Sequence, residues 1–158
     1  MAASVRAHAN LQLFLARKCI ERLEQPADPF WGEHAETVDR DHAVFHLQLA
    51  YRGHLADLCE QRQRTLRPVT AAQAVAMLQG EPIPEIAELA EKEELQDWLK
   101  ALVSENFLPG VETASLVNNS DLIPVSSPNA LSGARALSQI ADELASLFAR
   151  HRDTQQEY

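Results

Sequence analysis

Apolar residues recur at steps of three and four along most of the chain, which is the period of an amphipathic helix. Ala and Leu, which favour helices, dominate this pattern, whereas the β-branched residues that favour strands are scattered. The pattern therefore predicts an all-α protein. Its main helices are expected at residues 4–24, from Asp39 or Asp41 to about 65, at 85–107 and at 129–152, with a short helix between Thr70 and Gly80.

The ends of these helices carry residues that start or stop a helix. Ser4 and Thr70 suit the N-cap, where a hydroxyl oxygen accepts from a free backbone N–H, and Pro84 suits a first turn. Pro26 ends the first helix, and Gly80 ends the short one. Long helices bury their apolar faces against one another, so we expect an antiparallel four-helix bundle with one short extra helix.

The length of 158 residues is typical of one domain. Residues 1–152 are expected to form a single helical domain, and the polar residues 153–158 a frayed tail. Residues 111–128 carry no helical pattern and predict a long loop before the last helix. The preferred hypothesis is that Leu122 and Ile123 in this loop lie in a groove between helices. In the alternative, the loop opens and they contact a partner.

Phe30 and Trp31 place two large aromatic side chains in the short connection between the first two helices. The preferred interpretation is that both plug one end of the bundle. In the alternative, both remain exposed and anchor a protein partner, because buried aromatic anchors dominate the energy of many interfaces.

The net charge of the chain excludes some classes of binding partner. There are 14 basic and 23 acidic residues, a net charge of −9. Nucleic acids and anionic membranes both attract clustered Lys and Arg, so neither is an expected partner. No apolar run approaches the roughly 18–20 residues of a membrane span, and His8, Asn10 and Gln12 interrupt any signal-peptide core. The sequence predicts a cytoplasmic protein.

Acidic residues gather between residues 81 and 97. The preferred interpretation is a solvated helix face, since charge runs are usually exposed. The alternative is that Glu88, Glu91 and Glu94 form a docking surface for a basic partner, which predicts salt-sensitive association.

One group of residues suggests a metal site. Asp39, His42 and His46 follow one another at steps of three and four, which places all three on one helical face. Carboxylate and imidazole groups bind divalent transition metals such as zinc or iron. This spacing is similar to that of the DinB-like metal-dependent bundles, which use a further histidine on another helix. The preferred interpretation is that His42 and His46 are partly exposed polar residues without a metal.

Other catalytic patterns are weak. His54 lies three residues before Asp57, a spacing that suits a base and its orienting carboxylate, but a hydrogen bond at the surface is the preferred interpretation. The sequence contains neither a GxSxG nucleophile motif nor a Gly-rich phosphate loop. Cys19 and Cys59 lack paired spacing and are expected to be packing residues.

The Ala- and Leu-rich helices, together with the segment from Asp41 to Leu47 (DHAVFHL), are similar to a family of uncharacterised small proteins from pseudomonads and related gammaproteobacteria. The resemblance covers most of the chain and implies an all-helical fold without an assigned activity. The favoured hypothesis is a non-catalytic interaction or regulatory module with a protein partner, and a homodimer is compatible with it. The alternative is a DinB-like, metal-dependent enzyme that uses His42 and His46.

Overall fold

A computed structural model describes residues 3–108 and 130–156 of the chain. The predicted loop at 111–128, which includes Leu122 and Ile123, falls outside these residues. The described part contains six α-helices and a short 3-10 helix, with no strand, so the all-α prediction is confirmed for it. None of the helices in this part has the length and apolar character needed to cross a bilayer.

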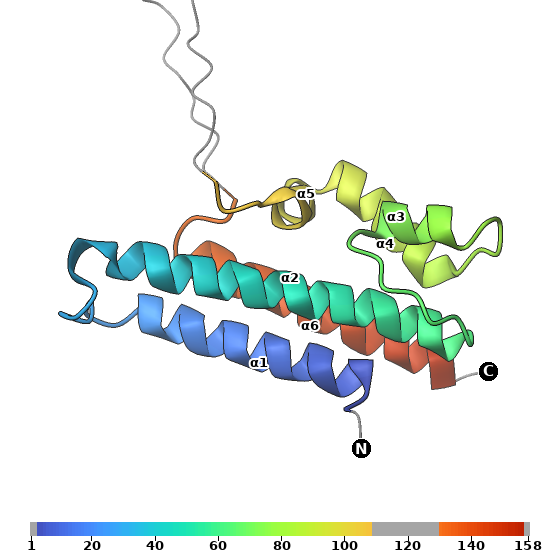
Figure 1. The fold of residues 1–158 in the computed structure, drawn as a ribbon, viewed down its shortest axis with the longest axis horizontal. Helices are drawn as coiled ribbons and strands as arrows, with labels where there is room; N and C mark the ends of the chain where they lie inside the picture. The colour runs from blue at the N-terminus through green and yellow to red at the C-terminus, as the bar shows by residue number, and fades with distance from the viewer. Residues whose placement is uncertain (1–2, 109–129, 157–158) are drawn as a thin grey trace, which may run out of the picture.

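Three long helices lie side by side and form one layer of the molecule (Figure 1). They are α1 (Val5–Leu23), α2 (Ala35–Gln61) and α6 (Ala134–Gln156). Arg6 near the start of α1 donates to Asp57 near the end of α2 at 2.9 Å and to Gln155 near the end of α6 at 3.0 Å. Helix α1 therefore runs against the other two, whereas α2 and α6 run in the same direction.

Three shorter helices form a second layer along one side of α2 and α6 (Figure 1). They are α3 (Ala71–Met77), α4 (Pro84–Leu95) and α5 (Asp97–Ser104). The helix expected at 85–107 is divided at Gln96, whose backbone is extended with φ −107° and ψ 114°. The turn lets Leu99 and Leu102 of α5 reach the core. The fourth long helix of the expected bundle is thus two short helices.

Local signals placed the starts of α1, α3 and α4 correctly, whereas α2 begins at Ala35 and not at Asp39 or Asp41 as expected. Ser4 Oγ accepts from the backbone N–H of Ala7, and Thr70 Oγ1 accepts from that of Gln73, so both predicted caps are confirmed. Pro84 occupies the first turn of α4, as expected. Helix α6 continues through residues 153–156, which were expected to fray, and Thr154 donates to Glu85 at 3.2 Å.

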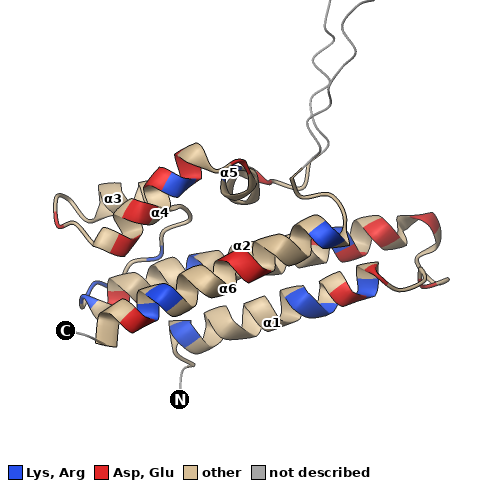
Figure 2. Cartoon of the chain, turned by 180° about the vertical axis from the view of Figure 1, so that it is seen from behind, with Lys and Arg blue, Asp and Glu red and all other residues tan. Residues whose placement is uncertain are grey.

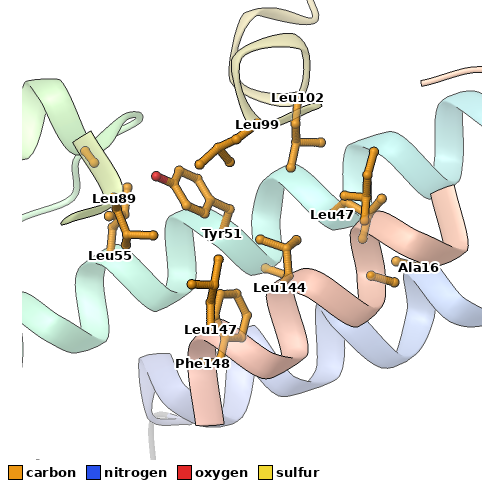
Figure 3. Packing of buried hydrophobic residues seen from close by; sticks show 14 of the residues in the cluster. Ala16, Leu47, Tyr51, Leu55, Leu89, Leu99, Leu102, Leu144, Leu147 and Phe148 are labelled. Atoms are coloured by element: carbon orange, nitrogen blue, oxygen red, sulfur yellow. The ribbon is translucent and has the colours of Figure 1, made fainter. Parts of the chain in front are cut away.

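The apolar core lies between the two layers and along the contact of α1 with α2 (Figure 3). Tyr51 of α2 points toward Leu99 of α5 above, and Leu144 of α6 lies below α2. Gly53 allows α1 and α2 to approach closely, because a Cβ at this position would lie 3.0 Å from the Cβ of Ala9. Both cysteines are free, with Cys59 buried and Cys19 half-buried.

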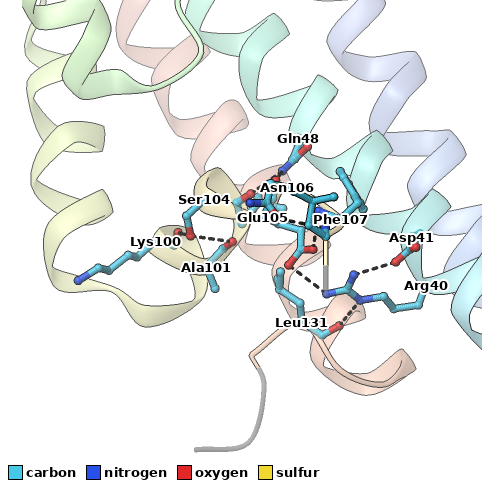
Figure 4. A network of polar contacts seen from close by, with 12 residues as sticks. Arg40, Asp41, Gln48, Lys100, Ala101, Ser104, Glu105, Asn106, Phe107 and Leu131 are labelled. Carbon is cyan, nitrogen blue, oxygen red and sulfur yellow. Dashed lines mark hydrogen bonds and ion pairs between the residues drawn. The ribbon is translucent and has the colours of Figure 1, made fainter. Parts of the chain in front are cut away.

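A polar network ties the end of α5 to α2 (Figure 4). Gln48 donates to the backbone carbonyls of Leu102 at 2.9 Å and Glu105 at 2.8 Å, which satisfies acceptors that the end of a helix leaves open. Arg40 donates to Glu105 at 3.3 Å and to the carbonyl of Leu131 at 3.4 Å. The chain before and after residues 109–129 is thereby attached to the same side chain of α2.

Candidate functional site

The predicted aromatic pair is displayed to solvent at one end of the long helices. Phe30 is 82% exposed and Trp31 is 39% exposed. Their ring centroids lie 5.0 Å apart at an interplanar angle of 84°, an edge-to-face contact. The expectation that the pair plugs the bundle is therefore wrong. We call Phe30 and Trp31 the aromatic tip.

A compact turn holds the aromatic tip in place. Asp28 Oδ1 accepts from the backbone N–H of Phe30 at 2.9 Å, and the carbonyl of Asp28 accepts from that of Trp31 at 3.1 Å. Gly32 follows with φ +58°, a conformation that favours glycine, and begins the 3-10 helix Gly32–His34. The backbone therefore turns through the tip and leads directly into α2, and the aromatic side chains remain on its outer side.

Exposed carboxylates lie on both sides of the aromatic tip along the chain. Glu24, Asp28, Glu33 and Glu36 are all exposed, and none forms an ion pair with Lys or Arg within the described ranges. Figure 2 shows these acidic segments in red along the connection and the start of α2. The tip is thus an apolar patch within a negative field.

The acidic stretch of α4 has mixed roles. Glu91 and Glu94 are exposed, as a solvated face requires. Glu88 is engaged within the fold: it accepts from Arg150 Nη1 at 3.0 Å and from His151 Nε2 at 3.2 Å, and it lies 3.9 Å from Lys92 Nζ. The three residues therefore do not form one free docking surface, because Glu88 joins α4 to α6.

Glu93, a fourth acidic residue of this stretch, is buried. It accepts from the Tyr51 hydroxyl at 2.7 Å, and from the backbone N–H groups of Ala71 and Ala72 at the start of α3 at 2.5 and 3.2 Å. Burial and the neighbouring carboxylate raise the pKa of Tyr51, so its hydroxyl remains a donor. This buried carboxylate holds α3, α4 and α2 together.

The predicted metal ligands contact α1 instead of one another. The carboxylate of Asp39 is buried 3.5 Å from Arg22 Nε, and His46 Nδ1 lies 2.6 Å from Gln12 Oε1. His42 is exposed. Burial, then the neighbouring His42, lowers the pKa of His46. Across residues 3–108 and 130–156, no three His, Cys, Asp or Glu side chains are placed to hold a metal ion.

His54 is the largest departure from expectation among the polar residues. It is 0% exposed, so the prediction of a surface hydrogen bond is wrong. Its ring stacks on Phe148 at 4.1 Å between centroids, and its Nε2 lies 2.9 Å from Nδ1 of His151. Asp57, the expected carboxylate partner, instead binds Arg6 at 2.9 Å.

His151 extends this contact to α4, because its Nε2 lies 3.2 Å from Glu88 Oε2. Burial lowers the pKa of both histidines, so both are neutral near neutral pH. A signal for this burial was present: His151 follows Leu144 and Leu147 in phase on the apolar stripe of the last helix. We call His54 and His151 the histidine pair.

A cleft of about 680 Å³ opens beside the histidine pair. It lies between the end of α2, the start of α4 and the last turns of α6. Its lining is mostly polar: Gln61, Arg62, Pro84, Glu85, Glu88, Arg150, His151, Thr154 and Gln155. His151 therefore lies between the buried His54 and this cleft.

No protein-family model, curated protein or solved structure matches the chain. The resemblance to the uncharacterised pseudomonad proteins remains a prediction. Function must therefore be inferred from two features of the chain itself, the aromatic tip and the histidine pair.

Proposed function

We propose that this chain is a non-catalytic, cytoplasmic interaction module that binds a protein partner through its aromatic tip. The observation that carries the proposal is the 82% exposure of Phe30 beside a partly exposed Trp31. Exposed aromatic groups in a contiguous patch mark interaction surfaces, because their burial against a partner removes a large apolar area from water.

The turn at Asp28 supports this role. Two hydrogen bonds that Asp28 accepts, together with the edge-to-face contact of the rings, hold the tip in one arrangement before binding. Ordering a flexible loop and its side chains costs free energy on association, and a pre-ordered loop avoids much of that cost. The tip is therefore suited to insert as a unit.

The charge around the tip defines the chemistry of the partner. The carboxylates of Glu24, Asp28, Glu33 and Glu36 would contact the rim of the partner's pocket, so this rim carries Lys or Arg around an apolar floor. The same carboxylates would repel those of a second copy. The partner is therefore expected to be a different protein, and the tip is not expected to be a homodimer contact.

The experiment compares proteins captured by three forms of the chain from cells that express it naturally. Phe30→Ala/Trp31→Ala removes the anchor, and Leu95→Ala is the control because Leu95 is apolar and 72% exposed on another element. We expect one set of proteins to be retained by the wild type and the control and lost, at least tenfold, by the tip variant. Equal capture by all three forms would contradict the proposal.

Two further measurements test the role of the carboxylates and the identity of the partner. Association with the captured protein, once purified, should slow when Glu33→Gln/Glu36→Gln is introduced, because rim charges mainly steer encounter. A dimer seen by analytical ultracentrifugation and lost in the tip variant would show instead that a second copy binds there.

A further inference from the structure

A chain of hydrogen bonds runs from the interior to the surface across three helices. It begins at His54 of α2, passes through His151 of α6 and reaches Glu88 of α4, with successive distances of 2.9 and 3.2 Å. Two nitrogens of Arg150 donate to the carboxylate of Glu88, so the carboxyl group at the surface end of this hydrogen-bond series is ionised. These contacts fasten the last turns of α6 to α4.

Only one arrangement of protons satisfies this chain when both histidines are neutral. The carboxylate of Glu88 accepts, so Nε2 of His151 carries the hydrogen and its Nδ1 must accept. Nε2 of His54 then donates to that Nδ1. Nδ1 of His54 is left bare, and it is buried without a hydrogen-bond partner in the described structure. In the neutral form the pair is thus joined to Glu88 by two hydrogen bonds.

A first added proton would enter at His54 Nδ1 and leave both hydrogen bonds in place, but it would create a buried N–H without an acceptor. A second added proton would put donors on both facing nitrogens, Nε2 of His54 and Nδ1 of His151, and would break the contact between the rings. The charged groups around the pair are Arg6 of α1, Asp57 of α2, Glu85, Glu88 and Lys92 of α4, and Arg150 and Arg152 of α6. Four are cations and three are carboxylates, so the surroundings do not compensate a further positive charge.

We propose that the histidine pair is an acid-sensitive clasp whose protonation separates the last turns of α6 from α4. His151 is the member that opens, because it lines the cleft and can reach water by a small displacement. Arg150 and Thr154, the other side chains that bind α4 there, are exposed and hold it through surface contacts. Opening uncovers the ring of Phe148, which stacks on His54 in the closed form.

This clasp is independent of the aromatic tip, which lies at the opposite end of the long helices (Figure 1). A fall in pH would therefore change the surface formed by the last turns of α6 and leave the surface around Phe30 and Trp31 unchanged. The release is local, since the contact of α1 with α2 depends on apolar packing around Ala16 and Leu47 and not on the histidines.

The test is hydrogen–deuterium exchange of the full chain between pH 7.5 and pH 5.5, expressed as protection factors so that intrinsic exchange rates cancel. Each histidine with an ordinary pKa of 6.5 in the open form adds up to about tenfold per pH unit below that value. We therefore expect protection at residues 147–152 to fall by up to about 100-fold at pH 5.5. Protection in α1 should change much less.

Two pairs of substitutions give the comparison. His54→Gln/His151→Gln keeps an amide donor and acceptor at each position but does not titrate, so its protection should not fall with pH. His34→Gln/His42→Gln removes two exposed histidines and should respond like the wild type. If the first pair does not fold, His54→Gln alone removes the site of protonation and should halve the logarithm of the wild-type response.

Three results would overturn the clasp. The first is unchanged protection of residues 147–152 in the wild type down to pH 5.5. The second is an equal loss of protection in α1 and α6, which would mean global unfolding. The third is the wild-type response in a variant without titratable groups at positions 54 and 151.

Discussion

The two ends of the long helices differ in which side chains they bury and which they expose. At one end, polar groups that usually remain in water are buried: His54 is 0% exposed and Asp57 is buried beside it. At the other end, Phe30, a side chain that usually leaves water, is 82% exposed. The first end has partners within the chain for most of these polar atoms, His54 Nδ1 excepted, whereas the second has no apolar surface that covers Phe30 in the described structure.

The two ends therefore contribute differently to the stability of the fold. Burying a polar group is favourable only when hydrogen bonds replace its water, and the His54–His151–Glu88 chain supplies them. An exposed aromatic pair adds little to folding, and the partner proposed above would supply the apolar contact that the described fold does not. The four predictions below test this contrast, in order of the size of the expected effect.

Two phenylalanines give the largest contrast. Phe148→Ala removes a buried ring that stacks on His54 and should lower the free energy of unfolding by about 3–5 kcal/mol. Phe30→Ala should change it by less than about 0.5 kcal/mol, because the ring makes few contacts to lose. Urea unfolding followed by circular dichroism measures both. Similar losses in the two variants would show that the tip is part of the core.

Two neighbouring glutamates of α4 allow the stability effect of a buried carboxylate to be compared with that of an exposed one. Glu93→Gln replaces a carboxylate oxygen with an amide N–H that opposes the backbone donors of α3, and should cost about 1–3 kcal/mol. Glu94→Gln, at an exposed position, should cost less than about 0.5 kcal/mol. The same urea titrations provide the measurement. Equal effects would argue against the Glu93 contacts.

The pH dependence of stability follows from the lowered pKa of both histidines. Below the ordinary value of 6.5 the unfolded chain takes up protons that the folded chain does not, so the stability is fully present above pH 6.5 and is lost as the pH falls. The slope should reach about 1.4 kcal/mol per pH unit for each histidine. His46, whose pKa is also lowered, acts in the same direction.

The variant without these groups provides the check on that slope. His54→Gln/His151→Gln should flatten the dependence of urea unfolding on pH between 7 and 5.5. Glu88 does not contribute to the slope between pH 7 and 5.5. The Arg150 and His151 contacts lower its pKa from 4.5, so the stability that these contacts provide is lost only at more acidic pH. A slope that persists in the variant would assign the titration to other groups.

The smallest effect is expected for metal. Equimolar zinc should leave the melting temperature unchanged, since Asp39 and His46 already contact Arg22 and Gln12. His42→Ala should likewise change stability little, because His42 is exposed. A thermal-shift series with elemental analysis measures both. Stoichiometric zinc that raises the melting temperature and is lost in His46→Ala would favour the enzyme alternative.

Most of the helices could be predicted because their signals are local. The caps at Ser4 and Thr70 and the proline at 84 act within the first turn of each helix, and the structure confirms all three. Leu47 and Tyr51 lie four residues apart on one apolar stripe, Leu137 and Leu144 lie seven apart on another, and all four are buried. These features depend on residues three or four positions apart.

The break at Gln96 could not be found in this way. The apolar stripe continues from Leu89 through Leu95 to Leu102 without a proline or glycine, so the local pattern favours one helix. In the structure Leu95 is 72% exposed, and the chain turns at Gln96 so that Leu99 packs on α2. The gain from that packing outweighs the loss of helical hydrogen bonds at the break.

The amino-acid sequence was sufficient for the helical class, the caps and the main apolar faces, because helix propensity and periodicity act over a few residues. The histidine pair joins residues 97 positions apart, and only the packing of α2 on α6 decided that His54 has a partner inside the core. The exposure of the aromatic tip was also a tertiary outcome, because no helix within residues 3–108 and 130–156 covers Phe30. Burial is a property of what surrounds a residue, and the sequence pattern shows only what the residue itself prefers.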